Sequence, residues 1–145
     1  QQMVALAALM PMVASMGGNA GTQTMTVTVR ALAMDELDSY KVRRLIAREM
    51  LVGILNGLIF ALLMGLLTWL RFFNPGLGLV IGLAMIVNMI AAGSAGVLIP
   101  LGLSKLKVDP AVASSVFVTT VTDVVGFFGF LGLAALWIRV FGSLP

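Results

Sequence analysis

Long stretches without a charged side chain constrain this chain more than any other feature. Residues 1–29, 50–70 and 72–104 contain no Asp, Glu, Lys or Arg, and residues 110–138 contain only Asp123. A helix that crosses the hydrocarbon core of a bilayer needs about 20 mostly apolar residues. Each run is therefore long enough to cross a membrane once and too short to cross it twice. The runs predict four transmembrane helices, over about 3–29, 48–70, 77–103 and 111–138.

Composition agrees with a membrane location. Only 10% of the residues are charged and 60% are hydrophobic, whereas a soluble domain is about 25% charged. Backbone polar groups in lipid must be satisfied within helices or closed barrels. The alternating pattern of a barrel strand is absent from this sequence. The predicted fold class is therefore all-α, a polytopic transmembrane helix bundle.

The chemistry open to the chain is narrow. The sequence has no Cys and no His, which excludes thiol catalysis, Cys/His zinc sites and Ser-His-Asp chemistry. No pair of acid–base groups shares one depth, so we do not expect an enzyme. A bound metal must be held by oxygen ligands, which suit hard cations such as Mg²⁺ or Ca²⁺.

The basic residues predict an orientation. Nine of the 15 charged side chains lie between residues 30 and 49, and five of these nine are basic. Lys105 and Lys107 follow the third run, whereas only Arg71 follows the second. Cytoplasmic loops carry the excess of Lys and Arg. Loops 30–48 and 104–109 are therefore predicted to be cytoplasmic, with both ends of the chain outside.

Asp123 lies at the middle of the fourth run, where a charge is costly and commonly marks an ion pathway. The alternative is a protonated Asp that serves only as a hydrogen-bond donor between helices. Ser115, Thr119 and Thr122 recur at helical spacing with Asp123, and Gly126 continues the same pattern. We interpret this stripe as one wall of an aqueous pore. Hydroxyl groups that bond back to helix carbonyls would explain the Ser and Thr residues without a pore.

The first run has a similar polar stripe, interrupted by glycines. Small residues four apart, such as Gly17 and Gly21, permit close helix approach, and a packing seam would explain the glycines alone. A seam does not require amide side chains, whose carbonyls could hold a hydrated cation. The candidate pore-lining residues of this run are Gly18, Asn19, Thr22 and Gln23.

Other small and amide residues are interpreted as packing features. Gly53 with Gly57, and Gly78 with Gly82, have the spacing of helix–helix seams. Asn88 is a single amide in an apolar run, and we expect it to form a hydrogen bond between helices.

Two segments carry a family resemblance. Residues 11–23 (PMVASMGGNAGTQ) are followed by 29–32 (VRAL), and residues 109–115 (DPAVASS) by 117–127 (FVTTVTDVVGF). In this order and at membrane depth, they resemble the MgtE-type magnesium channels and transporters. The resemblance covers essentially the whole chain. It implies that the chain holds the last four of five membrane helices, without the family's cytosolic N-domain, CBS domains and first membrane helix.

The resemblance also implies a function. The chain would form a homodimer in the bacterial inner membrane, with a pore along its two-fold axis. Asp123 would hold a hydrated Mg²⁺, the transported ion, and Ser115 and Thr119 would line the same wall. Two alternatives remain open from the residues: a proton-coupled secondary transporter with Asp123 as the proton relay, and a membrane scaffold that transports nothing.

Overall fold

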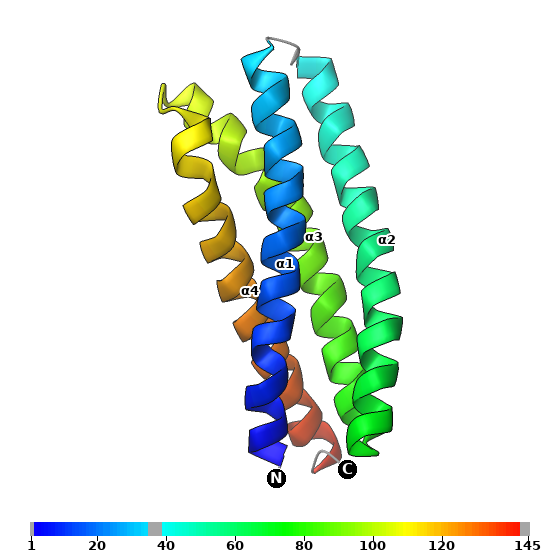
Figure 1. Cartoon of the computed structure of the whole chain (residues 1–145). Helices are drawn as coiled ribbons and strands as arrows, with labels where there is room; N and C mark the ends of the chain where they lie inside the picture. Colours follow the sequence, from blue (N-terminus) through cyan, green and yellow to red (C-terminus); the bar gives the residue numbers. More distant parts are fainter. Residues whose placement is uncertain (1, 35–38, 143–145) are drawn as a thin grey trace.

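A computed structural model of the chain describes residues 2–34 and 39–142. They form four long helices that run alternately up and down side by side (Figure 1). The described residues contain no strand, so the predicted all-α fold is confirmed. The helices are α1 (Gln2–Ala33), α2 (Ser39–Phe72), α3 (Pro75–Lys105) and α4 (Pro110–Phe141).

Each helix extends past its predicted apolar run, and the largest difference lies between α1 and α2. The sequence predicts a loop over 30–48, but α1 continues to Ala33 and α2 begins at Ser39. The basic residues from Lys41 to Arg48 therefore lie on the first turns of α2. Lys and Arg are good helix formers. An apolar run thus predicts the part of a helix that can lie in the membrane, whereas the helix itself continues beyond the run. Residues 35–38, with their acidic side chains, lie outside the described part of the chain.

Local capping fixes where α3 and α4 begin. The Oδ1 atom of Asn74 accepts a hydrogen bond from the Leu77 N–H at 2.8 Å, and Oδ1 of Asp109 accepts one from the Ala111 N–H at 2.9 Å. A proline follows each cap at the first helical position, where its missing N–H is not needed. Helix α3 therefore begins at Pro75, before the predicted run over 77–103, and α4 begins at Pro110, directly before the predicted run over 111–138.

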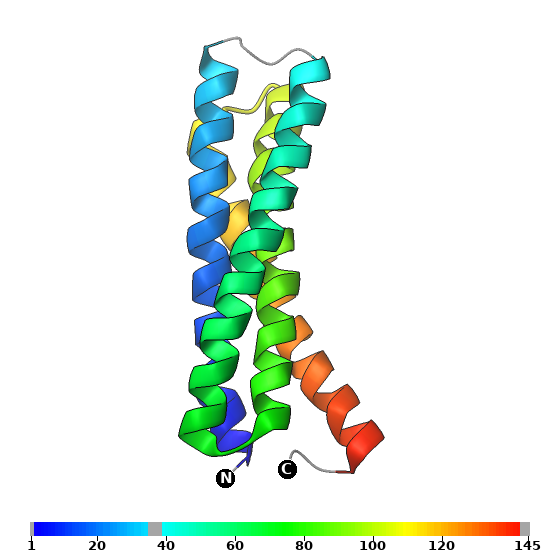
Figure 2. The ribbon, with the colours of Figure 1, turned by 90° about the vertical axis from the view of Figure 1, so that its right-hand side faces the viewer.

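Helix α3 is the centre of the bundle. It packs against each of the other three helices and, among the described residues, buries more of them than any other helix does. A hydrophobic cluster fills the half of the bundle that contains both chain ends, and Phe130 of α4 is fully buried in it. Figure 2 shows α4 crossing the bundle obliquely, so that its C-terminal end leans outward from α2 and α3. There Trp137 reaches back to the start of α3, where a Cβ at Gly76 would lie 2.8 Å from its ring.

The interface between α2 and α3 is a seam of small residues, as the glycine spacing predicts. A Cβ at Gly53 would lie 2.8 Å from the Met89 carbonyl oxygen, and one at Gly78 would lie 2.7 Å from the Gly65 carbonyl oxygen. Gly82 faces Ala61 across the same interface. Real Cβ atoms do not approach that closely, so Gly53 and Gly78 cannot be replaced without a shift of the two backbones.

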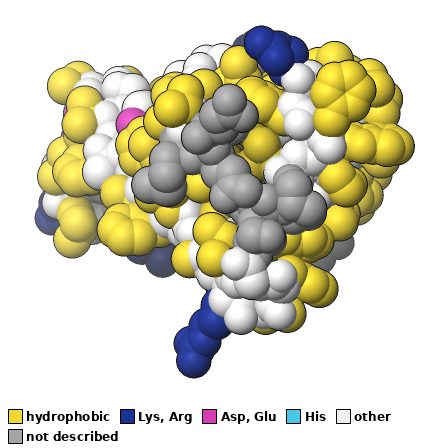
Figure 3. Space-filling model, turned by 90° about the horizontal axis from the view of Figure 1, so that it is seen from below, with side chains coloured by type: hydrophobic (Ala, Val, Ile, Leu, Met, Phe, Trp, Pro, Cys, Tyr) yellow, Lys and Arg dark blue, Asp and Glu magenta, His cyan; other side chains and the backbone are white. Residues whose placement is uncertain are grey.

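Three described helices, α2, α3 and α4, are long and apolar enough to cross a membrane. Many large hydrophobic side chains are exposed, and Figure 3 shows hydrophobic groups over much of the face seen from below, with basic side chains near its edges. Leu62 of α2 and Phe128 of α4 are each about three-quarters exposed, at 75% and 77%. Helix α1 has 32 residues but carries the polar stripe. Its place as a fourth span stays a prediction.

Candidate functional site

Asp123 lies at the edge of the buried face of α4. The residues that α4 buries follow one another at every fourth position, which places them on one side of the helix. Asp123 directly follows one of them, Thr122, and is therefore rotated by about 100° from it. The residue as a whole is half-buried. The buried residues of α4 are Ser114, Val118, Thr122, Gly126, Phe130 and Ala134.

Ser115 and Thr119 share that edge with Asp123. Each directly follows a buried residue, as Asp123 does, and both are exposed. The Thr119 hydroxyl donates to the Ser115 carbonyl at 2.9 Å. Its proton is therefore used within the helix, whereas the lone pairs of its oxygen remain available to accept. The edge thus presents acceptor groups one and two turns from the carboxylate.

Thr122 and Gly126 lie elsewhere than the stripe predicted. Thr122 is fully buried, and its hydroxyl donates to the carbonyls of Val118 at 3.1 Å and Thr119 at 2.9 Å. Gly126 is buried against α1, because a Cβ there would lie 3.2 Å from the Cα atom of Ala14. Both residues serve packing within one chain. A spacing of three residues, from Thr119 to Thr122 and from Asp123 to Gly126, placed them in the stripe. Three residues fall about 60° short of a full turn, which turns Thr122 and Gly126 toward the packed side of the helix.

The polar stripe of α1 lies opposite its packed face. Ser15, Asn19, Thr22 and Gln23 are all exposed, and Gly18 is half-buried. A Cβ at Gly18 would lie 3.7 Å from the Thr122 hydroxyl oxygen. Gly18 and Thr122 are therefore neighbours across the α1–α4 interface. The residues that follow them, Asn19 and Asp123, lie at the same depth.

The other glycines of α1 are packing positions. A Cβ at Gly17 would lie 2.1 Å from Nδ2 of Asn88, and one at Gly21 would lie 2.7 Å from a methyl of Val118. The seam interpretation is therefore confirmed for Gly17 and Gly21. The exposed amides beside them remain unexplained by packing within the chain. We group them with the edge of α4 under one name, the α1–α4 polar face: Ser15, Asn19, Thr22, Gln23, Ser115, Thr119 and Asp123.

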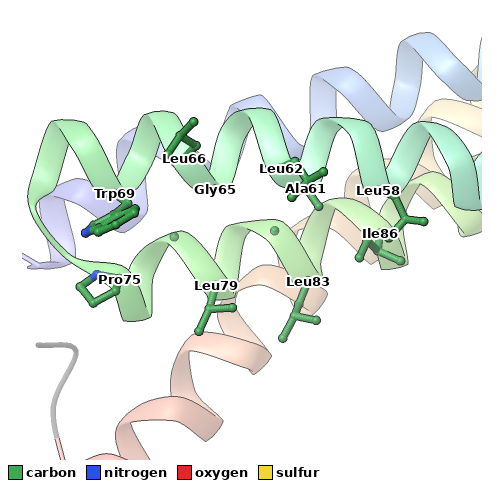
Figure 4. A pocket seen from close by; sticks show the side chains of 12 residues that line it. Leu58, Ala61, Leu62, Gly65, Leu66, Trp69, Pro75, Leu79, Leu83 and Ile86 are labelled. Carbon is green, nitrogen blue, oxygen red and sulfur yellow. The ribbon is translucent and has the colours of Figure 1, made fainter.

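A metal cage within one chain is absent from the described part. Across residues 2–34 and 39–142, no three carboxylates lie close enough to hold a metal ion. The cavity between α2 and α3, of about 450 Å³, is lined almost wholly by apolar side chains (Figure 4). Leu62, Trp69 and Leu79 are among them. Such a lining offers no ligand for a hydrated cation.

Sequence reasoning missed one polar contact, between Thr24 of α1 and Glu49 of α2. The Thr24 hydroxyl donates to the Glu49 carboxylate at 2.9 Å, and Thr24 is buried. A Cβ at Gly93 of α3 would lie 2.8 Å from the Glu49 carbonyl oxygen. Glu49 is the last charged residue of the cluster between 30 and 49. Its position directly before the uncharged run of α2 is the one feature in the sequence that distinguishes it from the loop residues.

The fold and the polar face define an all-α membrane protein with a carboxylate in mid-helix. Comparison with known proteins makes this more specific. Residues 10–133 match the model of the MgtE family, described as divalent cation transporters. The chain belongs to this family.

Three curated relatives named "Magnesium transporter MgtE" are similar over nearly the whole chain. The relative from Bacillus subtilis is 37% identical over 96% of this chain, and the relative from Enterococcus faecalis is 40% identical over 94%. The relative from Thermus thermophilus is 37% identical over 94% of this chain. The chain spans only 30–31% of the length of these relatives.

Proposed function

We propose that the protein carries Mg²⁺ across a membrane along the α1–α4 polar face, with Asp123 as the residue that attracts and holds the ion. One observation carries this proposal: a half-buried residue with a carboxylate side chain, Asp123, lies about halfway along a 32-residue apolar helix, at the depth of an exposed amide on the neighbouring helix. An ionisable residue in such a place commonly faces a cavity or an ion path. Membership in a family of divalent cation transporters supports the same function.

The path requires a second copy of the chain. The α1–α4 polar face is exposed on one chain, and lipid would leave its amides and its carboxylate unsolvated. Two copies related by a two-fold axis would place the faces opposite each other and enclose water between them. Such a homodimer brings together two Asp123 carboxylates, which repel unless a cation lies between them.

The ion would keep most of its water. Mg²⁺ dehydrates reluctantly and demands near-octahedral geometry at about 2.0–2.1 Å. One carboxylate per chain, with the neutral oxygens of Ser115 and Thr119, cannot supply six such ligands. Contacts through water tolerate a wider pore, and they let the ion leave, as conduction requires.

The topology follows from the positive charges. With α1 as the fourth span, the segments around 30–48 and 104–109 lie in the cytoplasm and both chain ends lie outside. In a bacterium this is the inner membrane. An inward cation flux would then be driven by the membrane potential, which is negative inside.

Magnesium flux into proteoliposomes tests the function and its mechanism. With a fluorescent Mg²⁺ indicator inside, we expect uptake that increases with an inside-negative potential and persists when the pH gradient is removed. Vesicles without protein are the control. Uptake that stops when the pH gradient collapses would instead support the proton-coupled alternative. No uptake under any gradient would overturn the proposed function.

A further inference from the structure

Asn88 is a fully buried amide at the centre of the bundle. It lies halfway along α3, with 0% of its surface exposed. Its Nδ2 donates to the backbone carbonyl of Val13 in α1 at 2.7 Å. The predicted hydrogen bond between helices is therefore present. Its Oδ1 atom, also buried, has no hydrogen-bond partner.

The same amide contacts both helices of the α1–α4 polar face. A Cβ at Gly17 of α1 would lie 2.1 Å from Nδ2, and a Cβ at Gly126 of α4 would lie 2.9 Å from the same atom. Glycine at both positions leaves the space that the amide fills. Asn88 thus fills the notch where α1 meets α4, contacts both helices, and is tied to α1 by its hydrogen bond.

Stability alone does not account for this residue. A buried polar oxygen without a partner destabilises a protein, and an apolar side chain of similar size would avoid that loss. Hydrogen bonds between membrane helices contribute modestly on average. An unsatisfied buried group of this kind calls for another explanation.

We propose that Asn88 is a positioning residue that sets the separation of α1 from α4 and thereby places Asp123 beside the amides of α1. This inference rests on the proposed ion path through Asp123. Gly126, which contacts Asn88, lies one turn from Asp123 on the same helix. A shift of α4 at Gly126 therefore moves Asp123 with it.

The substitution Asn88→Leu keeps the branched shape of the side chain but replaces the amide with bulkier methyl groups. A Leu methyl in the place of Nδ2 would lie 2.7 Å from the Val13 oxygen, whereas carbon–oxygen contacts need about 3.3 Å or more. Helix α1 must then move outward by about 0.6 Å. We expect Mg²⁺ flux in proteoliposomes to fall by roughly tenfold, within the range of residues that act at a distance. The unfolding temperature should fall by several degrees, because the larger side chain overpacks a fully buried position. Flux is therefore compared at a temperature at which the variant is folded.

Two variants serve as matched controls. Asn88→Asp keeps the shape, and a buried carboxylic acid stays neutral and can donate to the Val13 carbonyl; it should retain most of the flux. Met89→Leu changes the next residue of α3, which is buried against Gly53 and Gly57 of α2. It conserves volume and should transport like the wild type.

A second readout does not depend on transport. The chain has no cysteine of its own, and a Cβ at Gly18 lies 3.7 Å from the Thr122 hydroxyl, so the double variant Gly18→Cys/Thr122→Cys is near disulfide geometry. We expect a mild oxidant to form this bond readily in the otherwise wild-type protein. Adding Asn88→Leu should slow its formation by roughly tenfold, since bond formation depends steeply on separation. Adding Met89→Leu should not change it.

The outcomes separate the two proposals. An unchanged disulfide rate with Asn88→Leu overturns the positioning role, even if Asp123 proves essential for flux. A slowed disulfide rate in a protein whose flux does not depend on Asp123 would instead overturn the proposed ion path. If Asn88→Leu fails to fold, Asn88→Ala removes the donor without adding bulk. It should lower the flux, and wild-type flux in Asn88→Ala would contradict the inference.

Discussion

Mg²⁺ flux should be abolished by Asp123→Ala and reduced roughly hundredfold by Asp123→Asn. Unit charges about 4 Å apart attract by roughly 4 kcal/mol at the effective dielectric near a protein surface, and every 1.4 kcal/mol is a factor of ten. Part of this attraction is lost to screening by the ion's own water, so the expected loss of flux in Asp123→Asn is about two orders of magnitude. Neither variant should unfold the protein, because a charge within the membrane is itself unfavourable. Proteoliposome flux and the elution volume of the purified protein measure the two quantities.

Asp109→Asn is the matched control for Asp123→Asn. It removes a carboxylate from the start of the same helix, and an amide oxygen can still accept the Ala111 N–H that Asp109 now caps. Flux close to the wild type is expected. Wild-type uptake by Asp123→Asn would show that the mid-helix charge is not needed, and equal losses in both variants would point to a general effect of charge on α4.

The second large effect is on the stability of the fold, and it should differ between two adjacent glycines of α1. Gly17→Ala should lower the free energy of unfolding by about 1–3 kcal/mol, the usual cost of overpacking. The added Cβ would lie 2.1 Å from Nδ2 of Asn88, and the amide has no free space to enter. This steric cost exceeds the gain of up to about 1 kcal/mol that Ala brings over Gly in a helix. Unfolding in mixed detergent micelles measures the difference.

Gly18→Ala is the control, and we expect it to change the free energy of unfolding in the opposite direction. Its Cβ would lie 3.7 Å from the nearest atom outside the helix, at an ordinary contact distance. Helix propensity should then dominate, and the protein should be as stable as the wild type or more so. The larger Gly18→Leu should keep the fold and impair flux, because its side chain extends toward the polar face. If Gly17→Ala and Gly18→Ala had equal effects on stability, the placement of α1 would be wrong.

Much of the fold could be predicted because its causes are local in sequence. The uncharged runs identify the helices, and the residues Asn74 and Asp109 identify two helix starts through their own side chains. The small-residue spacing also identifies the α2–α3 seam, because close backbone approach has few other solutions. The ends of α1 and α2 could not be predicted in this way. Charged residues continue a helix into water as readily as they end a membrane span.

The candidate site could be predicted only in part. Asp123 is distinctive because a charge within a long apolar run needs a reason. The sequence alone could not show which residues of the stripe are exposed and which are buried, since a spacing of three or four residues places Ser115 and Thr122 on one broad face. Only the position of α1 shows that Thr122 and Gly126 are buried and that Ser115 is exposed. The contact between Thr24 and Glu49 depends on how α1 and α2 meet, which no local pattern encodes.

An experimental density map of the protein, obtained in magnesium, tests the central claim most directly. The account predicts a Mg²⁺ ion between the Asp123 carboxylates of two copies, on their two-fold axis. Its protein oxygens should lie beyond the direct-bond distance of about 2.1 Å, with water in between. A map of a dimer without an ion at Asp123 would contradict the account, and so would direct bonds from protein oxygens on three or more sides of the ion.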